Sequence, residues 1–285
     1  MRVLLTGARG QLATDLAKVL VDEDLTALSH GDLDVTSRPQ VDLAIISHAP
    51  DIVINTAAFH RVDDCESEIE KAFEANVYGA RNLALACKES SAALLHVSTD
   101  YVFDGAKPTP YLENDPARPI SVYGISKLAG ELVVAATLER HYIVRTSGLY
   151  GAAGASGKGG NFVNTMLRLA REDRTIKVVD DQRLTPTYTP DLARKIAWLI
   201  NTGSYGVWHA TNSGDCTWYE FAAKIFELAG LRPSLSPTTS AEFGAPAKRP
   251  ANSVLAHGML QRHQADDLPL WTEALDAYLA EVGLT

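Results

Sequence analysis

The sequence is poor in cysteine and has no long hydrophobic run. Its three cysteines, Cys65, Cys87 and Cys216, stand far apart with no Cys-x-x-Cys pair, which argues against a disulfide framework and a thiolate metal site. No apolar run approaches the roughly 20 residues that span a bilayer. The opening MRVLLTGARG lacks the layout of a signal peptide. We therefore expect reduced thiols, a cytoplasmic location and no membrane contact.

Positive charge is also scarce. The chain of 285 residues has 26 lysines and arginines against 35 carboxylates, a formal net charge of −9. A protein that binds nucleic acid needs a basic face, so we expect no nucleic-acid partner. A small anionic ligand needs only a local cluster of donors, which this balance allows.

Short apolar runs alternate with amphipathic stretches over the first two-thirds of the chain. This order predicts an α/β fold of the Rossmann type, a doubly wound parallel sheet with helices on both faces. Ligands of such sheets bind at the carboxyl ends of the strands. The predicted strands are Arg2–Thr6, Leu25–Ser29, Ile52–Thr56, Leu94–Ser98 and Tyr142–Thr146, and the predicted helices are Gln11–Leu20, Pro39–His48, Glu68–Cys87 and Val122–Leu138.

The pattern loosens after Arg145, where a glycine-rich loop, Gly148–Gly160, follows. We expect residues 1–148 to form a dinucleotide-binding domain to which 176–205 returns. Residues 149–175 and 206–285 would form a smaller, interleaved substrate domain. Its predicted elements, with the returning segment, are helices Phe162–Glu172, Thr189–Asn201, Thr217–Ala229 and Trp271–Val282 and the strand Ile176–Val179; Thr217 begins a Thr-x-x-Glu capping box.

A glycine loop follows the first predicted strand. In Thr6-Gly-Ala-Arg-Gly-Gln-Leu-Ala13, Gly7 permits a tight turn, Gly10 lets backbone N–H groups approach a pyrophosphate, and Ala13 allows close helix–strand packing. The helix amino terminus then meets the phosphates. The loop predicts a dinucleotide site, and a strand–helix turn without a ligand is the alternative. The predicted contacts are Gly7, Arg9, Gly10, Gln11 and Leu12.

The choice between NAD and NADP depends on the end of the second strand. An NAD site usually has an acidic residue about 20 positions after the loop, but here the strand ends at Ser29-His30-Gly31. The Arg9 guanidinium is placed to bind a 2′-phosphate. We predict NADPH, with NADH as the alternative. Asp34 and Val35 would line the adenine pocket, unless Asp34 caps the following turn.

Tyr123 and Lys127 are four residues apart on a predicted helix, so their side chains share one face. A lysine ammonium beside a phenol stabilises phenolate and lowers the tyrosine pKa. Such a tyrosine can give a proton to a developing alkoxide. Thr99, or less favourably Ser98, at the end of a strand would bind the carbonyl oxygen. Together with the glycine loop, this pattern predicts a nicotinamide-dependent carbonyl reductase.

Several motifs carry a specific resemblance over nearly the whole chain. The chain resembles extended short-chain dehydrogenase/reductases, and among them the dTDP-4-dehydrorhamnose reductase family. The motifs are the glycine loop, Asn55-Thr-Ala-Ala58, Val62-Asp63, the block Ser98-Thr-Asp-Tyr-Val-Phe-Asp-Gly105, Tyr123-Gly-x-x-Lys127, Arg145-Thr-Ser147, Asn161-Phe-Val163, Asp181-Gln182, Pro186-Thr-Tyr188, Arg249-Pro250 and Ser253-x-Leu255.

The resemblance implies reduction of the 4-keto group of dTDP-4-dehydro-6-deoxy-L-mannose to dTDP-L-rhamnose by NAD(P)H. It implies that Thr99, Tyr123 and Lys127 are catalytic, that Tyr123 and Lys127 also contact the cofactor, and that Ala57 and Ala58 line the cofactor channel. Arg249 would bind the sugar diphosphate, because a guanidinium forks onto phosphate oxygens. The implied substrate-binding residues are Val62, Thr99, Tyr101, Phe103, Asn161, Pro186 and Arg249; a helix cap is the other interpretation of Asn161, and a rigid turn that of Pro186.

One departure from the family concerns substrate choice. Relatives often have a tryptophan near the sugar where this chain has Gly148, and Tyr150 is the residue that would compensate. The alternatives are therefore a reductase of another nucleotide-linked keto-sugar, and a non-catalytic NADP-binding regulatory subunit. An epimerase or a dehydratase using Asp100 is less favoured.

The resemblance also suggests a metal ion and a second subunit. Some relatives carry Mg²⁺ at a subunit contact, for which Glu273 and Glu281 are the candidate ligands; a solvated helix face is the simpler interpretation. No cluster of histidine, cysteine and carboxylate has ligand spacing, so we predict no metal site in the chain itself. A homodimer formed through helices is consistent with the family.

Overall fold

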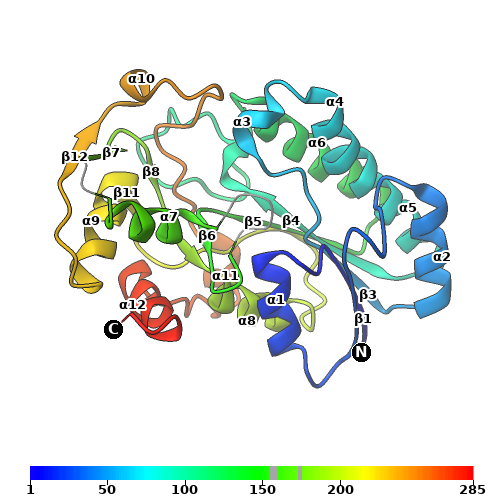
Figure 1. Cartoon of the computed structure of the whole chain (residues 1–285). Coiled ribbons are helices and arrows are strands. Elements are labelled where there is room, and N and C mark those ends of the chain that lie inside the picture. Colours follow the sequence, from blue (N-terminus) through cyan, green and yellow to red (C-terminus); the bar gives the residue numbers. More distant parts are fainter. Residues whose placement is uncertain (155–159, 173–174, 285) are drawn as a thin grey trace.

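The computed structural model describes residues 1–154, 160–172 and 175–284 (Figure 1). Six strands form one parallel sheet in the order β10-β5-β4-β3-β1-β2. Residues 155–159, the middle of the predicted glycine-rich loop, lie outside the described residues. The strands of this sheet are β1 (Arg2–Thr6), β2 (Asp24–Leu28), β3 (Ile52–Asn55), β4 (Ala93–Thr99), β5 (His141–Thr146) and β10 (Gly206–His209).

The side of the sheet on which the chain adds new strands changes at β1. The chain runs from β1 to β2 on one side and then returns to build β3, β4 and β5 on the other. Loops leaving β1 and β3 therefore separate at the carboxyl edge and leave room for a ligand between them. This arrangement confirms the predicted Rossmann-type fold.

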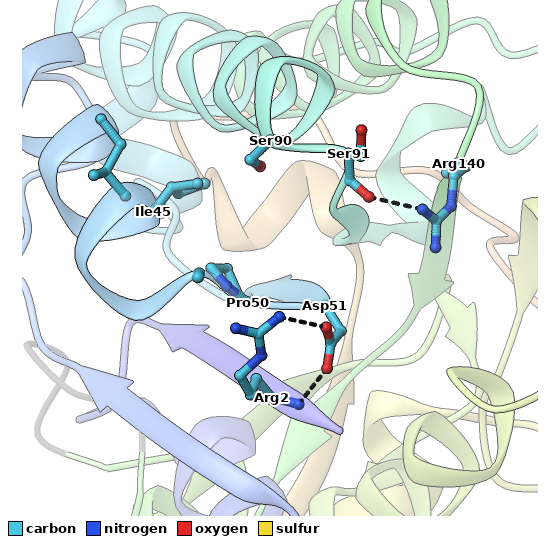
Figure 2. A pocket seen from close by; sticks show the side chains of 9 residues that line it. Arg2, Ile45, Pro50, Asp51, Ser90, Ser91 and Arg140 are labelled. Carbon is cyan, nitrogen blue, oxygen red and sulfur yellow. Dashed lines mark hydrogen bonds and ion pairs between the residues drawn. The ribbon is translucent and has the colours of Figure 1, made fainter.

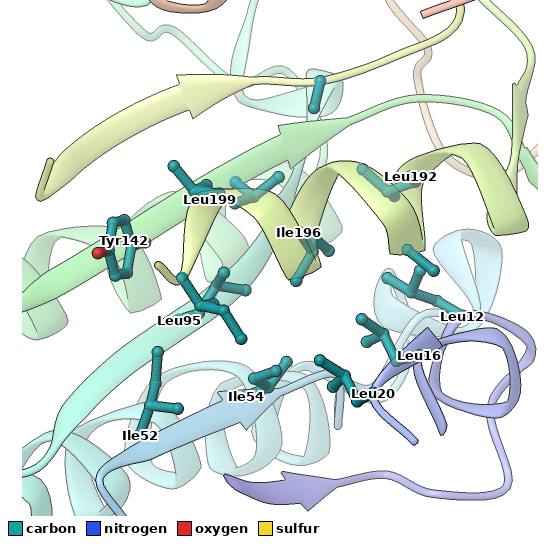
Figure 3. Close-up of a cluster of buried hydrophobic side chains, with 14 of the residues drawn as sticks. Leu12, Leu16, Leu20, Ile52, Ile54, Leu95, Tyr142, Leu192, Ile196 and Leu199 are labelled. Atoms are coloured by element: carbon teal, nitrogen blue, oxygen red, sulfur yellow. The ribbon is translucent and has the colours of Figure 1, made fainter. Parts of the chain in front are cut away.

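Helices cover both faces of the sheet (Figure 1). On one face, α1 and α8 pack on the strands through leucines and isoleucines such as Leu16 and Ile196, which are fully buried against Ile54 and Leu95 (Figure 3). On the other face, α2, α5 and α6 bury a second cluster. These helices are α1 (Gln11–Val19), α2 (Arg38–His48), α5 (Ala80–Ser90), α6 (Val122–Thr137) and α8 (Thr189–Leu199).

A second part of the molecule has its own core of aromatic and aliphatic side chains, with Tyr150, Phe221 and Tyr278 fully buried at its centre. It is built from α7 (Phe162–Leu169), α9 (Trp218–Leu228), α12 (Trp271–Glu281) and the pair β7 (Ile176–Val179) and β12 (Leu235–Thr238). The predicted capping box at Thr217 is present, with Thr217 and Glu220 each bonding the other's backbone N–H.

Strand pairing shifts two pieces of the expected domain division. Strand β10, expected in the substrate domain, pairs with β5 in the main sheet. Strand β7, expected to return to the dinucleotide-binding domain, pairs with β12 instead, while α8 does return and packs on α1. Short elements complete the chain: α3 (Val62–Cys65), α4 (Ile69–Phe73), η1 (Glu74–Gly79), η2 (Asp100–Val102), β6 (Leu149–Tyr150), β8 (Arg183–Leu184), β9 (Thr187–Tyr188), β11 (Cys216–Thr217), α10 (Ser240–Phe243) and α11 (Gly258–Arg262).

The predicted helix Glu68–Cys87 is interrupted by a turn of π-helix, η1. Its Asn76 side chain donates to the carbonyl of Phe59 at 3.0 Å and accepts the Phe59 N–H at 2.9 Å. Such π-helical turns are rare and frequently lie at functional sites. Across the described residues, no helix is both long enough and apolar enough to cross a membrane.

Candidate active site

The glycine loop closes tightly over the end of β3. Gly7 has a φ of +75°, and a Cβ at this position would lie 2.9 Å from the Ala57 nitrogen and 2.8 Å from the Thr56 hydroxyl. The Gly10 N–H turns back to the Gly7 carbonyl at 2.8 Å, and α1 begins at the next residue. The loop thus brings the amino terminus of α1 to the carboxyl edge of the sheet, next to β1, where the strand order reverses. Phosphate groups bind at such helix termini.

Two buried polar atoms at this edge have no protein partner among the described residues. The Gln11 side chain donates to the Leu149 carbonyl at 3.0 Å, but its Oε1 atom is unsatisfied. The Thr146 hydroxyl, at the end of β5, is also unsatisfied. Since buried polar groups are rarely left unpaired, these atoms and the glycine cradle fit a polar ligand such as a nicotinamide dinucleotide.

The carboxylate at the end of β2, that of Asp32, is bonded by the chain itself. Ser29 is buried there, and both its backbone N–H and its hydroxyl bond to Asp32, at 2.9 and 2.6 Å. Arg9 is exposed and close enough to Asp32 to lower the pKa of that carboxyl, which the hydrogen bonds from Ser29 lower most. Arg9 is therefore a cation near the end of β2, and its contact with a 2′-phosphate stays a prediction.

Asp34 and Val35 have structural roles in the described chain. Asp34 accepts hydrogen bonds from the Thr36 N–H at 2.9 Å and from the Thr36 hydroxyl at 2.8 Å, which is the turn-capping alternative. The Val35 side chain is buried against Gly79. Their part in an adenine pocket stays a prediction.

Tyr123 is placed by the start of α6. Ser121 caps the helix by accepting the Gly124 N–H at 3.2 Å. Gly124 lies so close to η2 that a Cβ would be 2.2 Å from the Tyr101 carbonyl oxygen. The helix is thereby held against η2, with the Tyr101 and Tyr123 rings edge to face at 5.9 Å. The glycine in Tyr-Gly-x-x-Lys is thus required by packing.

Thr99 and Tyr123 lie on either side of Tyr101. The Thr99 hydroxyl accepts the Tyr101 N–H at 3.2 Å and donates to Asp100 at 3.0 Å, and its side chain opposes the rise of the Tyr123 pKa that burial causes. Burial raises the pKa of Asp100 to about 6, against hydrogen bonds from Ser253, Ser147 and Thr99. Asp100 is therefore held in a network of hydroxyl donors, which favours positioning over acid catalysis.

The expected lowering of the Tyr123 pKa is not seen in this structure. Burial raises the pKa of Tyr123 well above its ordinary value, and the hydrogen bond to Thr99 opposes that shift only in part. Lys127 Nζ instead donates to the Val97 carbonyl at 2.7 Å and lies 3.4 Å from His96 Nε2. Burial lowers the pKa of Lys127 to about 8, and Glu131 opposes this. The lysine is thus easy to deprotonate near neutral pH.

A buried ion pair supports these residues. Glu131, four residues after Lys127 on α6, accepts three hydrogen bonds from Arg145, of which the shortest, from Nη2, is 2.7 Å. Both side chains are at least 94% buried. Glu131 Oε1 also accepts from the Ser98 hydroxyl at 2.5 Å. This pair, which the sequence analysis did not assign, ties α6 to the ends of β4 and β5.

Arg249 faces the tyrosines across from α6. Its guanidinium pairs with Asp63 at 2.9 Å and hydrogen bonds to Tyr101. Asp63 follows Val62, which begins α3 and is partly exposed. The structure thus brings together Tyr101, Tyr123 and Arg249, three of the predicted site residues.

Three predicted contacts have other roles. Phe103 is fully buried, stacks on Tyr111 at 4.2 Å and lies beneath the Arg145 guanidinium, so its assignment to the substrate site was wrong. Asn161 caps α7 by accepting the Asn164 N–H at 2.9 Å and donates to the Gly151 carbonyl at 3.0 Å, which matches the cap interpretation. Pro186 is buried in the turn between β8 and β9.

The glycine that replaces the family tryptophan has a physical cause. Gly148 has a φ of +54°, and a Cβ there would lie 2.9 Å from the Leu184 side chain. Tyr150 cannot compensate for a lost sugar contact, since its ring is fully buried between Tyr188 and Tyr278. Any aromatic contact with the sugar must come from another part of the chain.

The metal candidates and a surface hollow beside Arg2 both lie outside this site. Among the described residues, no group of three or more histidines, cysteines and carboxylates is arranged to hold a metal ion. Glu281 accepts from the Tyr188 hydroxyl at 2.6 Å, and Glu273 accepts the Leu270 N–H at 3.1 Å. A hollow of about 280 Å³ opens at the amino edge of the sheet, where Arg2 pairs with Asp51 (Figure 2).

The fold and these side chains define the protein class. One parallel sheet with a glycine loop after β1, and a threonine, a tyrosine and a lysine at the ends of β4 and α6, are the features of an extended short-chain dehydrogenase/reductase. The chain matches the family described as "RmlD substrate binding domain" over residues 1–284. It belongs to this family of dTDP-4-dehydrorhamnose reductases.

Relatives and solved structures resemble the whole chain. A dTDP-4-dehydrorhamnose reductase of Streptomyces griseus is 42% identical, with 96% of this chain and 91% of the relative aligned. A dTDP-4-keto-6-deoxy-D-glucose reductase of Streptomyces niveus is 39% identical, with 96% and 95% aligned. The crystal structure of dTDP-4-dehydrorhamnose reductase from Bacillus anthracis in complex with NADP superposes with a TM-score of 0.94 at 41% identity, covering 98% of this chain and 99% of that one.

Proposed function

We propose that this protein reduces the 4-keto group of dTDP-4-dehydro-6-deoxy-L-mannose to give dTDP-L-rhamnose, with NADPH as the reductant. The observation that carries this is the placement of Thr99, at the end of β4, and of Tyr123, at the start of α6, on either side of Tyr101, whose backbone N–H donates to Thr99 and whose ring meets that of Tyr123, with Lys127 one turn further along α6. Relatives named for this reaction match the chain from end to end, and a close structural relative was crystallised with NADP.

The residues of the chain divide the work of the reduction. NADPH supplies a hydride when it is bound. Thr99 and Tyr123 bind the keto oxygen, and Tyr123 gives its phenolic proton to the oxygen as negative charge develops there. Arg249 binds the sugar diphosphate, and Gly7, Arg9, Gly10, Gln11 and Leu12, with Ala57 and Ala58, hold the cofactor. Val62 and Tyr101 line the sugar side.

Substrate choice is the test of this proposal. We expect turnover with dTDP-4-dehydro-6-deoxy-L-mannose to exceed that with dTDP-4-keto-6-deoxy-D-glucose in kcat/KM, as measured by NADPH consumption. The second sugar is the alternative substrate, because a relative of 39% identity is named for its reduction. The reverse order of kcat/KM would move the assignment to that sugar, and tight NADPH binding without turnover on any keto-sugar would favour a regulatory subunit.

Arg9 gives a prediction on cofactor choice. Because its guanidinium is exposed and lies near Asp32 at the end of β2, we expect replacement of Arg9 by Ala to remove a charged hydrogen bond to the 2′-phosphate. We expect the KM for NADPH to rise about tenfold or more and the KM for NADH to stay unchanged. Steady-state kinetics with both cofactors measures this. An equal rise for both would mean that Arg9 does not bind the 2′-phosphate.

The domain division remains our proposal with adjusted bounds. The dinucleotide-binding domain comprises residues 1–148, helix α8 and strand β10. The substrate domain comprises the remaining carboxyl-terminal elements around the core at Tyr150 and Phe221. The reaction draws on NADPH and a nucleotide sugar, and we place it in the cytoplasm, where both are made.

We also propose a homodimer formed through α6. Its outer face carries an apolar stripe, Ile125, Ala129, Leu132 and Ala136, at helical spacing. Ile125 is 44% exposed and Leu132 is 61% exposed. A second copy offers the same stripe, so that a twofold axis brings like faces together and buries both.

Leu132→Glu tests the dimer. Burying two glutamates in the shared face costs more than the stripe gains, so we expect light scattering to find a dimer for the wild type and a monomer for the variant. Leu43→Glu is the matched control, since Leu43 is 66% exposed on α2, away from the stripe. A wild-type monomer at micromolar concentration, or a dimer that survives Leu132→Glu, contradicts the proposal.

A further inference from the structure

A chain of buried polar side chains runs beneath the site from β1 to α6. The Thr6 hydroxyl donates to Asn55 Oδ1 at 2.7 Å, Asn55 Nδ2 lies 3.0 Å from His96 Nδ1, and His96 Nε2 lies 3.4 Å from Lys127 Nζ. All four side chains are at most 2% exposed. Of the four, only Lys127 is catalytic by the resemblance to the family.

The orientation of Asn55 is fixed by a backbone donor. Its Oδ1 atom accepts the Ala57 N–H at 3.1 Å, and a backbone N–H can only donate. The amide NH₂ group must therefore face His96, so the Nδ1 atom of His96 accepts. Burial and the charge of Lys127 hold the pKa of His96 well below its usual value. A neutral imidazole that accepts at Nδ1 carries its hydrogen on Nε2.

The tautomer of His96 affects the protonation of Lys127. An ammonium group has three donors and no acceptor, whereas an uncharged amine has a lone pair. An Nε2–H group directed at Nζ therefore favours the amine. We propose that His96, held by Asn55 in the Nε2–H tautomer, is a positioning residue that donates to Lys127 and stabilises it after Lys127 has released its proton. This inference rests on the proposed function of Lys127.

The contact between His96 and Lys127 completes the proton balance of the reduction. The O–H bond of Tyr123 breaks as the O–H bond of the alcohol forms, which leaves a phenolate. The phenolate regains the proton that leaves the Lys127 ammonium, and the resulting amine is the form that accepts from His96. Solvent then returns a proton to Lys127. Without the donor at His96, Lys127 would hold its proton more tightly.

Other ionisable groups around Lys127 set the background. Glu131 on the same helix raises the pKa of Lys127 and is itself paired with Arg145 of β5. The pKa of Tyr123, rather than that of Lys127, is raised by three other groups: Asp100 and Tyr101 of η2 and Cys65 of α3. His96 is the titratable group of β4 that contacts the lysine nitrogen.

Nitrogen NMR of the histidine rings tests the tautomer directly. We expect His96 to carry hydrogen on Nε2. His209 is an internal control, because its Nδ1 atom lies 3.1 Å from two carbonyl oxygens, those of Tyr111 and Ala256, and must carry hydrogen on Nδ1. His96→Asn identifies the His96 signals. An Nδ1–H tautomer at His96 overturns the proposal.

A titration measures the effect on Lys127. In His96→Asn the donor to Nζ is lost, and we expect the pKa of Lys127, followed by NMR of its Cε group, to rise by roughly half to one unit. His96→Gln keeps an amide N–H within reach of Nζ and should shift it less. This measurement needs neither substrate nor cofactor, so it decides the inference even if the keto-sugar is not reduced.

The pH profile of turnover gives the functional readout. Reduction needs a protonated Lys127, so kcat falls as pH rises through its pKa, near 8 in the wild type. We expect the alkaline limb to move upward by the same half to one unit in His96→Asn. A variant that loses activity equally at every pH, with an unmoved limb, has only lost structure, and that result overturns the proposal.

Discussion

Tyr123→Phe is expected to lower kcat by about 10²- to 10⁴-fold, the usual contribution of a positioned proton donor. The phenylalanine keeps the ring that lies edge to face with Tyr101 at 5.9 Å, so the start of α6 is preserved. What is lost is the hydroxyl that contacts Thr99. The affinity for NADPH, measured by fluorescence, should change by less than about twofold, because the missing group acts on the substrate oxygen.

Tyr205→Phe is the matched control. Tyr205 also has a hydroxyl that takes part in a hydrogen bond, here from Arg140 at 3.0 Å, but it is exposed and belongs to a loop before β10. Its kcat should equal that of the wild type. If Tyr123→Phe kept more than a tenth of the wild-type turnover, another group would be the proton donor.

Glu131→Gln is expected to lower the free energy of unfolding by about 3–5 kcal/mol, because it leaves the buried charge of Arg145 uncompensated. Arg145 is 6% exposed and Glu131 is 3% exposed, so water cannot replace the lost carboxylate. The variant also weakens the bond that holds Ser98, next to Thr99. Denaturant unfolding of the protein measures the change.

Two further variants separate the charge from the packing. In the double variant Glu131→Leu with Arg145→Met both charges are removed, and we expect much of the stability to return. The exposed pair of Arg38 and Glu89 is the surface control, since Glu89 is 63% exposed, and Glu89→Gln should cost at most about 1 kcal/mol. Equal losses for Glu131→Gln and Glu89→Gln would show that the Arg145 charge is not confined to the interior.

Local sequence patterns were enough to predict most strands of the main sheet and the site residues at the end of one strand and the start of one helix. The five strands predicted for the main sheet match β1 to β5 within one residue at each end. The apolar runs of β1, β3, β4 and β5 are buried in the sheet, while β2 lies at its edge and is half-exposed. Thr99 and Tyr123 were paired from their places at a strand end and a helix start. Strand β10 was not predicted, since its four residues, Gly-Val-Trp-His, are too short a run to mark a strand before β5 lies beside them.

Contacts between distant segments could not be predicted. Glu131 and Arg145 have no pattern that marks them as partners, although Glu131 lies four residues after Lys127 and so on its face of the helix. His96 differs from its apolar neighbours in β4, and that is the only sequence signal for the network beneath Lys127. Phe103 was assigned with the block that contains it, but its side chain turns into the core.

The central claim is that this chain carries out reduction at C4 of a dTDP-linked 6-deoxy-4-keto-hexose. Incubation of the wild type with dTDP-4-dehydro-6-deoxy-L-mannose and NADPH deuterated at the nicotinamide C4 tests it most directly. We predict a dTDP-L-rhamnose product with deuterium at sugar C4 and loss of the label from the cofactor, both observed by NMR. Unlabelled product, label at another carbon, or recovered keto-sugar with the cofactor still reduced would contradict it.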